Sequence, residues 1–455
     1  GHHRQTMRFI FFPFLFLLTV GSLWAQPKQN SPYSRFGIGD LLPQYFASQA
    51  GMGGQTAAYH DPYHVNLSNP ASYAFLRTTA LETALYGKFS HYKSSTSTLD
   101  NWSGNLAYLA LGFTLKSPIN EVLDKDKSPR RLGMGFSLTP YSLVGYNIVT
   151  QDTLSSGPVE NLFLGNGGMY KMTWSSAIRY KQSAFGVNLG WAFGKAKYET
   201  EANFEDSFNP TLGSFRSNIR QDLGINGFLW NVGAQHDFVL KYDARDRETA
   251  TELITVGLSA EGQHGLRISS DELFVRSRRR LGTGQFDQPD TLRYEGNVKK
   301  SLTLPASVTL GAMYSSTKWK LGAQLGFTGW SAYKNEARPE TLRNTFSASA
   351  GLEYTPDVIS YNRYLKRVRY RAGVYYRQDP RLIRVGSTDQ ELNDLGMTFG
   401  LGFPLILPRQ QTSFVNTAFE LGRLGANTAI EETYYRITLG FTLNDNTWFY
   451  KRRFE

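Results

Sequence analysis

Most of the chain alternates apolar residues with polar or small residues at every second position. The segment 434–443 follows this pattern throughout, and the segment 318–328 repeats it. Successive side chains of a β-strand point to opposite faces of the sheet, so a period of two predicts strands with one apolar face. In the second segment, the apolar face is predicted to hold Trp319, Leu321, Leu325 and Phe327.

About fourteen segments carry this pattern, and they are longer than the five or six residues that are usual in soluble proteins. A soluble sandwich would turn the apolar faces inward, whereas a membrane barrel turns them toward lipid and small or polar residues toward the lumen. Segment length, Tyr and Trp at the ends of apolar faces, and Gly and Ser on polar faces favour the barrel. In lipid every backbone group must be paired, so the sheet must close; the prediction is an all-β, antiparallel transmembrane β-barrel. The candidate strands are 81–92, 104–116, 131–146, 168–181, 184–199, 227–242, 252–264, 304–315, 318–330, 344–354, 368–377, 395–404, 412–421 and 434–443.

The composition agrees with such a barrel. The 455 residues include 43 Gly, 30 Phe and 26 Tyr, a mixture typical of outer-membrane barrels. Aromatic residues make up 14% of the chain and charged residues 19%, which argues against intrinsic disorder. There is no Cys, which excludes disulfides, thiolate metal sites, a Cys nucleophile and a lipid anchor on Cys.

The net charge of +11 is spread along the chain. Scattered basic residues do not form the stripe or patch that nucleic-acid binding requires, so no nucleic-acid partner is expected. The one dense basic run, Arg276 with Arg278, Arg279 and Arg280, lies in a polar stretch. We interpret it as a solvated loop; contact with acidic lipid headgroups or a partner protein is the alternative.

Residues 1–25 contain the pattern of a secretory signal peptide. A positive residue precedes the apolar run Phe9–Val20, and small residues lead to Ala25 before the polar Gln26. A transmembrane helix is the alternative, but the run of about 12 residues falls short of the roughly 20 that a span needs. We predict an exported chain that is cleaved after Ala25, with residues 1–6 as an upstream remnant.

Residues 26–78 are rich in Gly, Pro, Asn and Ser and show no sustained alternation. An aromatic, glycine-rich segment before a barrel is predicted to fold into the lumen as a plug; a flexible periplasmic extension is the alternative. The barrel is predicted over 79–443, and a basic-aromatic tail follows over 444–455. Within the barrel, 265–303 fits either a long loop or strand ends that extend beyond the membrane.

Two motifs suggest a family. Residues 51–71 combine a Gly-rich run with an acid, an Asn and then Asn-Pro-Ala, and a Leu-Pro strand start at 304–305 is followed by a Trp-Ser strand end at 330–331. These motifs resemble the FadL-type long-chain fatty-acid transporters of bacterial outer membranes. The resemblance implies fourteen strands, an N-terminal plug, and passage of hydrophobic small molecules sideways into the membrane lipid. The plug residues of the motif are Gly51, Gly53, Gly54, Asp61, Asn66, Asn69, Pro70 and Ala71.

Three other segments, 31–37, 165–168 and 448–455, resemble a branch of this family that is common in Bacteroidota. That branch includes relatives that are subunits of protein-export machinery. Typical barrels end on an aromatic residue of the last strand, whereas here a tail follows Leu443. The resemblance therefore implies either a transporter or an accessory barrel with outer-membrane protein partners.

A lateral exit would need a strand whose pairing is locally broken. Thr139, Pro140 and Tyr141 lie in the third candidate strand, and Pro removes a backbone donor from the sheet. In the resembled family, an inward kink of the third strand makes such an opening, so these residues are a candidate lateral gate. The alternative is that Pro140 marks the end of the strand at the membrane surface.

Catalytic and metal-binding patterns are weak. His60 and His64 flank Asp61, but the sequence His-Asp-Pro cannot lie inside a helix, so hydrogen bonding within the plug is expected rather than a metal site. No Gly-x-Ser-x-Gly elbow or complete phosphate-binding loop is present. We expect neither an enzyme nor a cofactor.

Two functions follow from the sequence. The first is transport of hydrophobic compounds through a plugged barrel, for which a continuous apolar tunnel would be diagnostic. The second is a non-conducting accessory barrel in an outer-membrane assembly or secretion complex. A lumen filled by charged and aromatic side chains would favour the second.

Overall fold

The computed structural model describes residues 31–116, 118–124, 128–155, 157–204, 215–246, 249–280, 283, 285–408 and 411–447. The predicted signal peptide at 1–25 and residues 448–455 of the predicted tail lie outside the described residues. No described helix is long and apolar enough to cross a membrane.

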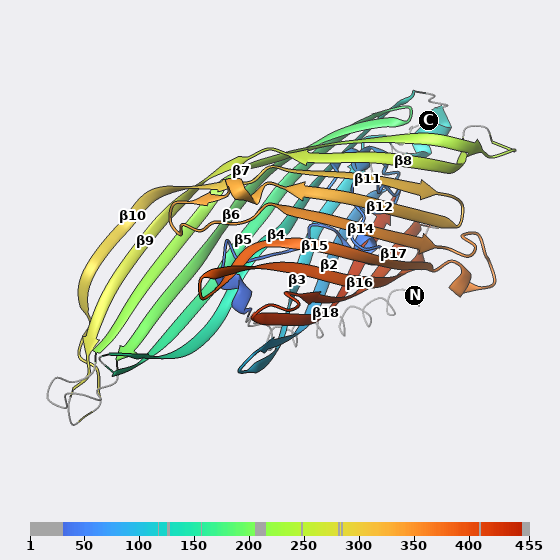
Figure 1. Cartoon of the computed structure of the whole chain (residues 1–455). Helices are drawn as coiled ribbons and strands as arrows, with labels where there is room; N and C mark the ends of the chain where they lie inside the picture. Colours follow the sequence, from blue (N-terminus) through green and yellow to red (C-terminus); the bar gives the residue numbers. More distant parts are fainter. Residues whose placement is uncertain are drawn as a thin grey trace, which may run out of the picture.

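Fourteen strands form one closed antiparallel barrel (Figure 1). β18 pairs with β2 from Ile430 to Asp445, which closes the sheet. The predicted barrel and its number of strands are therefore confirmed. The barrel strands are β2 (Thr79–Ser94), β3 (Thr98–Thr114), β4 (Arg130–Leu154), β5 (Gly157–Tyr180), β6 (Ser183–Phe204), β7 (Phe215–Tyr242), β8 (Ala250–Glu261), β11 (Ser307–Ser315), β12 (Trp319–Thr328), β14 (Thr345–Tyr354), β15 (Arg369–Val385), β16 (Thr388–Leu407), β17 (Gln411–Leu424) and β18 (Ile430–Asp445).

The strands place alternate side chains outside and inside the barrel, as the period of two predicts. On β12, Trp319, Leu321, Leu325 and Phe327 are 42%, 45%, 53% and 49% exposed, and polar or small residues between them face inward. An exposed apolar belt of this kind is stable only against lipid. The chain is thus a bacterial outer-membrane barrel.

A curved sheet, which we call the wing, extends beyond one end of the barrel (Figure 1). The strands β4 to β7 have 22 to 28 residues, whereas about 9–11 residues cross a bilayer. Part of β7, 215–226, pairs with β9 (His264–Arg278), which pairs in turn with β10 (Asp290–Leu304). The segment 265–303 therefore consists mainly of strands beyond the barrel. The wing comprises β9, β10 and residues 140–154, 157–170, 193–204 and 215–226.

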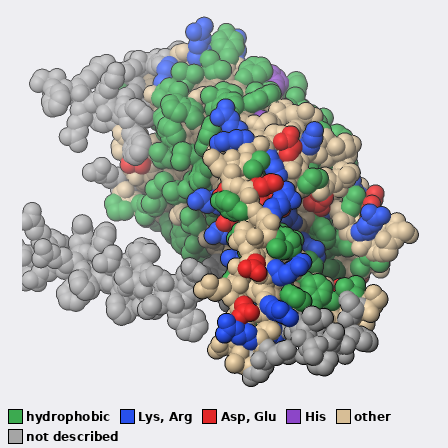
Figure 2. Space-filling model, turned by 90° about the vertical axis from the view of Figure 1, so that its left-hand side faces the viewer, with side chains coloured by type: hydrophobic (Ala, Val, Ile, Leu, Met, Phe, Trp, Pro, Cys, Tyr) green, Lys and Arg blue, Asp and Glu red, His purple; other side chains and the backbone are tan. Residues whose placement is uncertain are grey.

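Apolar side chains fill the space between the wing and the barrel. Leu266, Ile268, Leu302 and Leu304 of β9 and β10 pack in one buried cluster with Trp330. Trp330 begins η3 (Trp330–Ala332), and β13 (Lys334–Asn335) pairs with the end of β10. Seen from the wing side, basic and acidic side chains are interspersed beside a broad hydrophobic area (Figure 2). The wing is thus a packed extension with a charged exterior.

Residues 31–78, which we call the N-terminal segment, lie inside the barrel and are coloured blue in Figure 1. Most of their side chains are buried. The short elements of this segment are η1 (Pro32–Arg35), β1 (Asp40–Leu41), α2 (Ala47–Ala50) and η2 (Pro70–Phe75). The remaining short elements of the chain are α3 (Pro118–Asp124) and η4 (Tyr364–Lys366).

Candidate functional site: the barrel interior and a break in its wall

The backbone of the N-terminal segment touches the barrel wall at glycines. A Cβ atom added to Gly257 would lie 1.7 Å from the carbonyl oxygen of Ala57, and one added to Gly351 would lie 1.9 Å from that of Met52. A side chain at either position would occupy the space of the segment's backbone. Further glycines of the wall that meet the segment within 3 Å of an added Cβ include Gly133, Gly186, Gly233, Gly373 and Gly400.

Two asparagines hold the turns of the segment together. Asn69 caps η2, because its side-chain oxygen accepts from the N–H of Ala71 at 3.1 Å and its amide donates to the carbonyl of Ala57 at 2.7 Å. Asn66 donates to the carbonyls of Thr56 and Tyr59 at 2.7 and 2.9 Å. Pro70 follows the cap at the first position of η2, where a missing N–H costs nothing. The turn backbone is thus satisfied without water.

Asp61 anchors the segment to β15 and to β12. Its carboxylate lies 2.7 Å from Arg369 and 3.5 Å from Lys320, and it accepts the N–H of Tyr63 at 2.8 Å. Burial alone would raise the pKa of Asp61, but the cations of Arg369 and Lys320, together with His64, hold it well below its usual range. Asp61 is therefore ionised inside the barrel.

A chain of polar side chains continues from Asp61 into the wall. His64 Nδ1 lies 3.0 Å from Asp61, and its Nε2 lies 2.9 Å from the amide nitrogen of Asn416. Because that amide donates, Nε2 accepts and the proton is assigned to Nδ1. Asn416 in turn accepts from Arg371 at 2.8 Å, and Arg371 pairs with Glu353 at 2.7 Å. The network joins the N-terminal segment to β14, β15 and β17.

The other histidine of the N-terminal segment, His60, has a different partner. His60 Nε2 lies 2.9 Å from Asp237 on β7, and its ring stacks on Phe75 at 3.8 Å between centroids. The two histidines thus bond separate carboxylates. Within the described part of the chain, no group of three or more His, Asp or Glu side chains is arranged to hold a metal ion.

A second anchor lies nearer the wing. Arg381 of β15 pairs with Asp40 of β1 at 2.5 Å and with Asp379 at 2.7 Å, and donates to the carbonyl of Tyr33 at 3.0 Å. Tyr45 donates to Glu420 of β17 at 2.5 Å. The beginning of the segment is thereby bonded to the same side of the wall as Asp61.

The wall itself is interrupted between β3 and β4. Their pairing covers only Leu109–Thr114 opposite Gly133–Leu138. Beyond that point, residues 98–108 of β3 pair with β2, and residues 139–154 of β4 pair with β5. The two strands therefore diverge at Thr139, and the β4–β5 register shifts between Pro140 and Ser142. Because Pro lacks the N–H, it is compatible with such an edge position.

The N-terminal segment covers the free edge of β4 from within. β1 pairs with Ser142 and Leu143 of β4. Flanking bonds run from the N–H of Leu42 to the carbonyl of Tyr141 at 3.0 Å and from the N–H of Ser31 to that of Gly145 at 2.7 Å. The segment thus takes the place beside β4 that β3 occupies along Gly133–Leu138.

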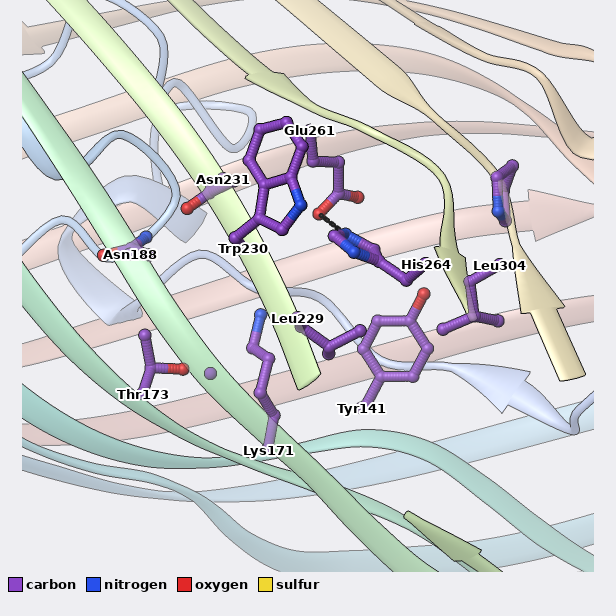
Figure 3. A pocket seen from close by; sticks show the side chains of 12 residues that line it. Tyr141, Lys171, Thr173, Asn188, Leu229, Trp230, Asn231, Glu261, His264 and Leu304 are labelled. Atoms are coloured by element: carbon purple, nitrogen blue, oxygen red, sulfur yellow. Dashed lines mark ion pairs between the residues drawn. The ribbon is translucent and has the colours of Figure 1, made fainter. Parts of the chain in front are cut away.

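Three interior cavities are small. At the fork of β3 and β4, a cavity of about 30 Å³ is lined by Pro43, Tyr108 and Pro140, among others. A polar cavity of about 110 Å³ lies between Asp40, Arg436 and neighbouring charged residues. The third, of about 20 Å³, lies on the other side of β4 and is shown in Figure 3. Since one water needs about 10–15 Å³ on this measure, the cavities have room for one to several waters.

The cavity of Figure 3 is lined by both polar and apolar side chains and contains an ion pair. Lys171 and Trp230 line it, and His264 lies 3.7 Å from Glu261 across the bend between β8 and β9. Tyr141, a candidate gate residue, faces the same space. Charged and aromatic side chains, together with the segment, therefore occupy much of the interior.

Comparison with known proteins identifies the family. The family model described as BamG matches residues 7–455. The chain belongs to the BamG family. No curated protein matches the chain.

The fold of this BamG-family chain is similar to solved structures of hydrophobic-compound transporters. A FadL homologue from Pseudomonas aeruginosa has a TM-score of 0.54 at 14% identity, with 89% of this chain and 99% of the homologue covered. The toluene transporter TbuX from Ralstonia pickettii has a TM-score of 0.52 at 13% identity (88% and 99%), and the toluene transporter TodX from Pseudomonas putida 0.52 at 16% (90% and 99%). The predicted resemblance to FadL-type proteins is confirmed at the level of the fold.

The predicted plug residues all lie in the N-terminal segment of this BamG-family barrel, but they meet different parts of the wall. Gly51, Gly53 and Gly54 lie against β14–β16 or Tyr45, Asp61 binds Arg369, and Asn66 with Asn69 fixes the turns. Pro70 and Ala71 approach Gly186 of β6. The candidate gate residues Thr139, Pro140 and Tyr141 lie on β4, apart from the Asp61 cluster and at the fork. The sequence did not single out Arg369 and Lys320, the partners of Asp61, since no local motif marks a residue that acts across the barrel.

Proposed function

We propose that the chain is a non-conducting accessory barrel of an outer-membrane protein complex. The observation that carries the proposal is the N-terminal segment, which is bonded to the wall across the interior through Asp61, His64 and Asp40. Moving such a segment aside would leave buried charges without partners, and breaking a buried ion pair is strongly unfavourable. Membership of the BamG family, rather than of a family named for a transported compound, is in line with this role.

Transport of hydrophobic compounds, with long-chain fatty-acid-like molecules as cargo, is the second candidate. The break in the wall beside Pro140 favours it, because a lateral opening would let an apolar molecule leave the barrel directly into lipid. The fold shared with TodX and TbuX adds to this candidate. In this function, the N-terminal segment acts as a plug and Thr139, Pro140 and Tyr141 border the exit.

Two measurements on the full chain separate the candidates. Gentle detergent extraction from native membranes should yield a protein in fixed stoichiometry with this chain if it is an accessory subunit. Liposomes that contain the purified chain should then take up a fluorescent long-chain fatty acid no faster than liposomes with an unrelated closed barrel. Faster uptake, with bound lipid and no stoichiometric protein, would establish the transporter instead.

A further inference from the structure

The outward face of β6 changes from apolar to basic where the wing leaves the barrel. Its outward positions from Phe185 to Phe193 are apolar, a length that fits the roughly 9–11 residues that cross a bilayer core. The next outward residue is Lys195, which is exposed. Because each residue advances about 3 Å across the bilayer, Lys195 lies about 6 Å beyond Phe193, and the headgroup layer is about 5–7 Å thick. Lys195 is therefore at the level of the lipid headgroups.

Two further cations lie on the same face of the sheet. Lys195 is opposite Gly224 of β7, which is opposite Ser269 of β9. Ser269 is opposite Lys299 of β10, and Arg267 is the neighbouring outward residue of β9. We call Lys195, Arg267 and Lys299 the basic band. All three side chains are exposed, and none of them forms an ion pair or a hydrogen bond with another described residue.

The surface between these cations is open. A Cβ atom added to Gly224 would meet a single backbone oxygen, at 4.0 Å. Asn226, the neighbouring outward residue of β7, is exposed and opposite Arg267. A phosphate above Gly224 can therefore accept hydrogen bonds from long cationic side chains around it and from this amide. The nearest acids on β7 and β9, Asp222 and Asp271, lie further from the barrel.

The outer part of the wing has the opposite arrangement. Three arginines there pair with glutamates: Arg216 with Glu201 at 2.6 Å, Arg220 with Glu199 at 3.4 Å and Arg293 with Glu295 at 2.7 Å. Arg220 precedes Asn226 by six residues, which places it about 18 Å further from the bilayer core and outside the headgroup layer. The cations without a carboxylate are thus those beside the membrane.

We propose that the basic band binds the phosphates of lipid headgroups in the outer leaflet. The wing contains the longest connection between paired barrel strands, from β8 to β11, and the longer connections of outer-membrane barrels are extracellular. Lys195 and Arg267 hold one phosphate from the two sides of β7, and Lys299 extends the site along β10. The bound lipid fixes the base of the wing on the membrane. This binding does not depend on whether the barrel is an accessory subunit or a transporter.

Lipid binding by the full chain in neutral detergent tests the basic band. Native mass spectrometry measures the affinity for lipid A and for the same lipid after removal of its phosphates. Replacing all three residues of the band by Gln should weaken the binding of lipid A about a hundredfold, since each cation beside a charged membrane surface contributes about fivefold. The matched control replaces Arg216, Arg220 and Arg293 by Gln, which removes the same charge and should leave the affinity unchanged.

An independent variant adds a carboxylate to the centre of the site. Gly224→Glu has room for its side chain and should weaken the binding of lipid A about fivefold or more, whereas the neutral Gly224→Gln should weaken it less. All variants must keep the heat-modifiable mobility of a folded barrel. Equal affinity of the wild type for the two lipids, or equal loss in the band and control variants, would overturn the proposal. If the band variant keeps lipid A but loses a protein that co-purifies with the wild type, the band is a protein interface and the proposal is wrong.

Discussion

The fit of the N-terminal segment against Gly257 can be tested by adding a single methyl group. In Gly257→Ala, the new Cβ would lie 1.7 Å from the oxygen and 2.4 Å from the carbon of the Ala57 carbonyl. A carbon–oxygen contact is ordinarily about 3.3–3.6 Å, so the carbonyl must move by about 1.6 Å or more. Asn69 and Gln235 both donate to that carbonyl, at 2.7 and 3.1 Å, and would lose their bonds.

The substitution should weaken the docking of the N-terminal segment and leave the pairing of the barrel strands unchanged. Overpacking costs about 1–3 kcal/mol and each lost hydrogen bond about 1 kcal/mol, so docking should weaken by about 3–5 kcal/mol. Amide hydrogen exchange over residues 47–59 in detergent should accelerate strongly, while the barrel keeps its heat-modifiable mobility. Gly87→Ala is the matched control, because an added Cβ there meets nothing within 4 Å. Equal exchange in the two variants would refute the close contact.

Five further predictions follow from the structure and the sequence. Leu325→Arg should destabilise the barrel by up to about 2–4 kcal/mol in bilayer refolding because Leu325 faces lipid; a neutral effect would contradict that orientation. Asp61→Asn should release the segment, measured as faster proteolysis within residues 44–71, because it leaves Arg369 buried without its carboxylate. The folded-state pKa of Asp61 is depressed, so this anchor is fully present above the ordinary Asp pKa of about 3.9 and is lost as the pH falls through the lower folded value. Proteolysis of the wild type should therefore rise only in acid. An equal rise in Asp61→Asn would exclude Asp61 as the cause. Mass spectrometry of the membrane-extracted chain should find Gln26 as its first residue, and retained Phe9–Val20 would disprove the signal peptide. Deletion of 44–71 should leave a folded barrel with increased conductance in planar bilayers, and unchanged conductance would mean that the segment does not close the lumen.

The strands could be predicted from the sequence because lipid imposes the alternation. On β12 and β18, every outward position that faces lipid must be apolar, so the period of two is visible in the residues themselves. The same constraint does not act on the parts of the strands that lie beyond the membrane surface. The wing parts of β5 and β7, 157–170 and 215–226, face water on their outer side, where nothing demands an apolar residue, and these extensions were not predicted.

The contacts of the site could not be predicted for a different reason. Asp61 and Arg369 are 308 residues apart in the chain and meet because closure of the barrel places β15 beside the segment. Neither residue lies in a sequence motif that indicates its partner. No sequence motif indicates the break between β3 and β4 either, since pairing depends on the register of two strands. Pro140 alone indicated a weakened position, without showing which neighbour is lost.

The closed interior and the broken wall can be explained together. A fourteen-strand barrel is too wide for its own side chains to fill, so a folded segment must occupy the lumen if it is to stay closed. Here that segment also supplies a strand, β1, to the edge of β4. The segment that fills the lumen therefore also stabilises the wall at the break. An accessory barrel can keep this coupling permanently, because the edge of β4 is already held in place by β1. A transporter would instead have to break the bonds of Asp40 and Leu42 to widen its exit. These bonds therefore favour an interior that stays closed over one that repeatedly opens to lipid.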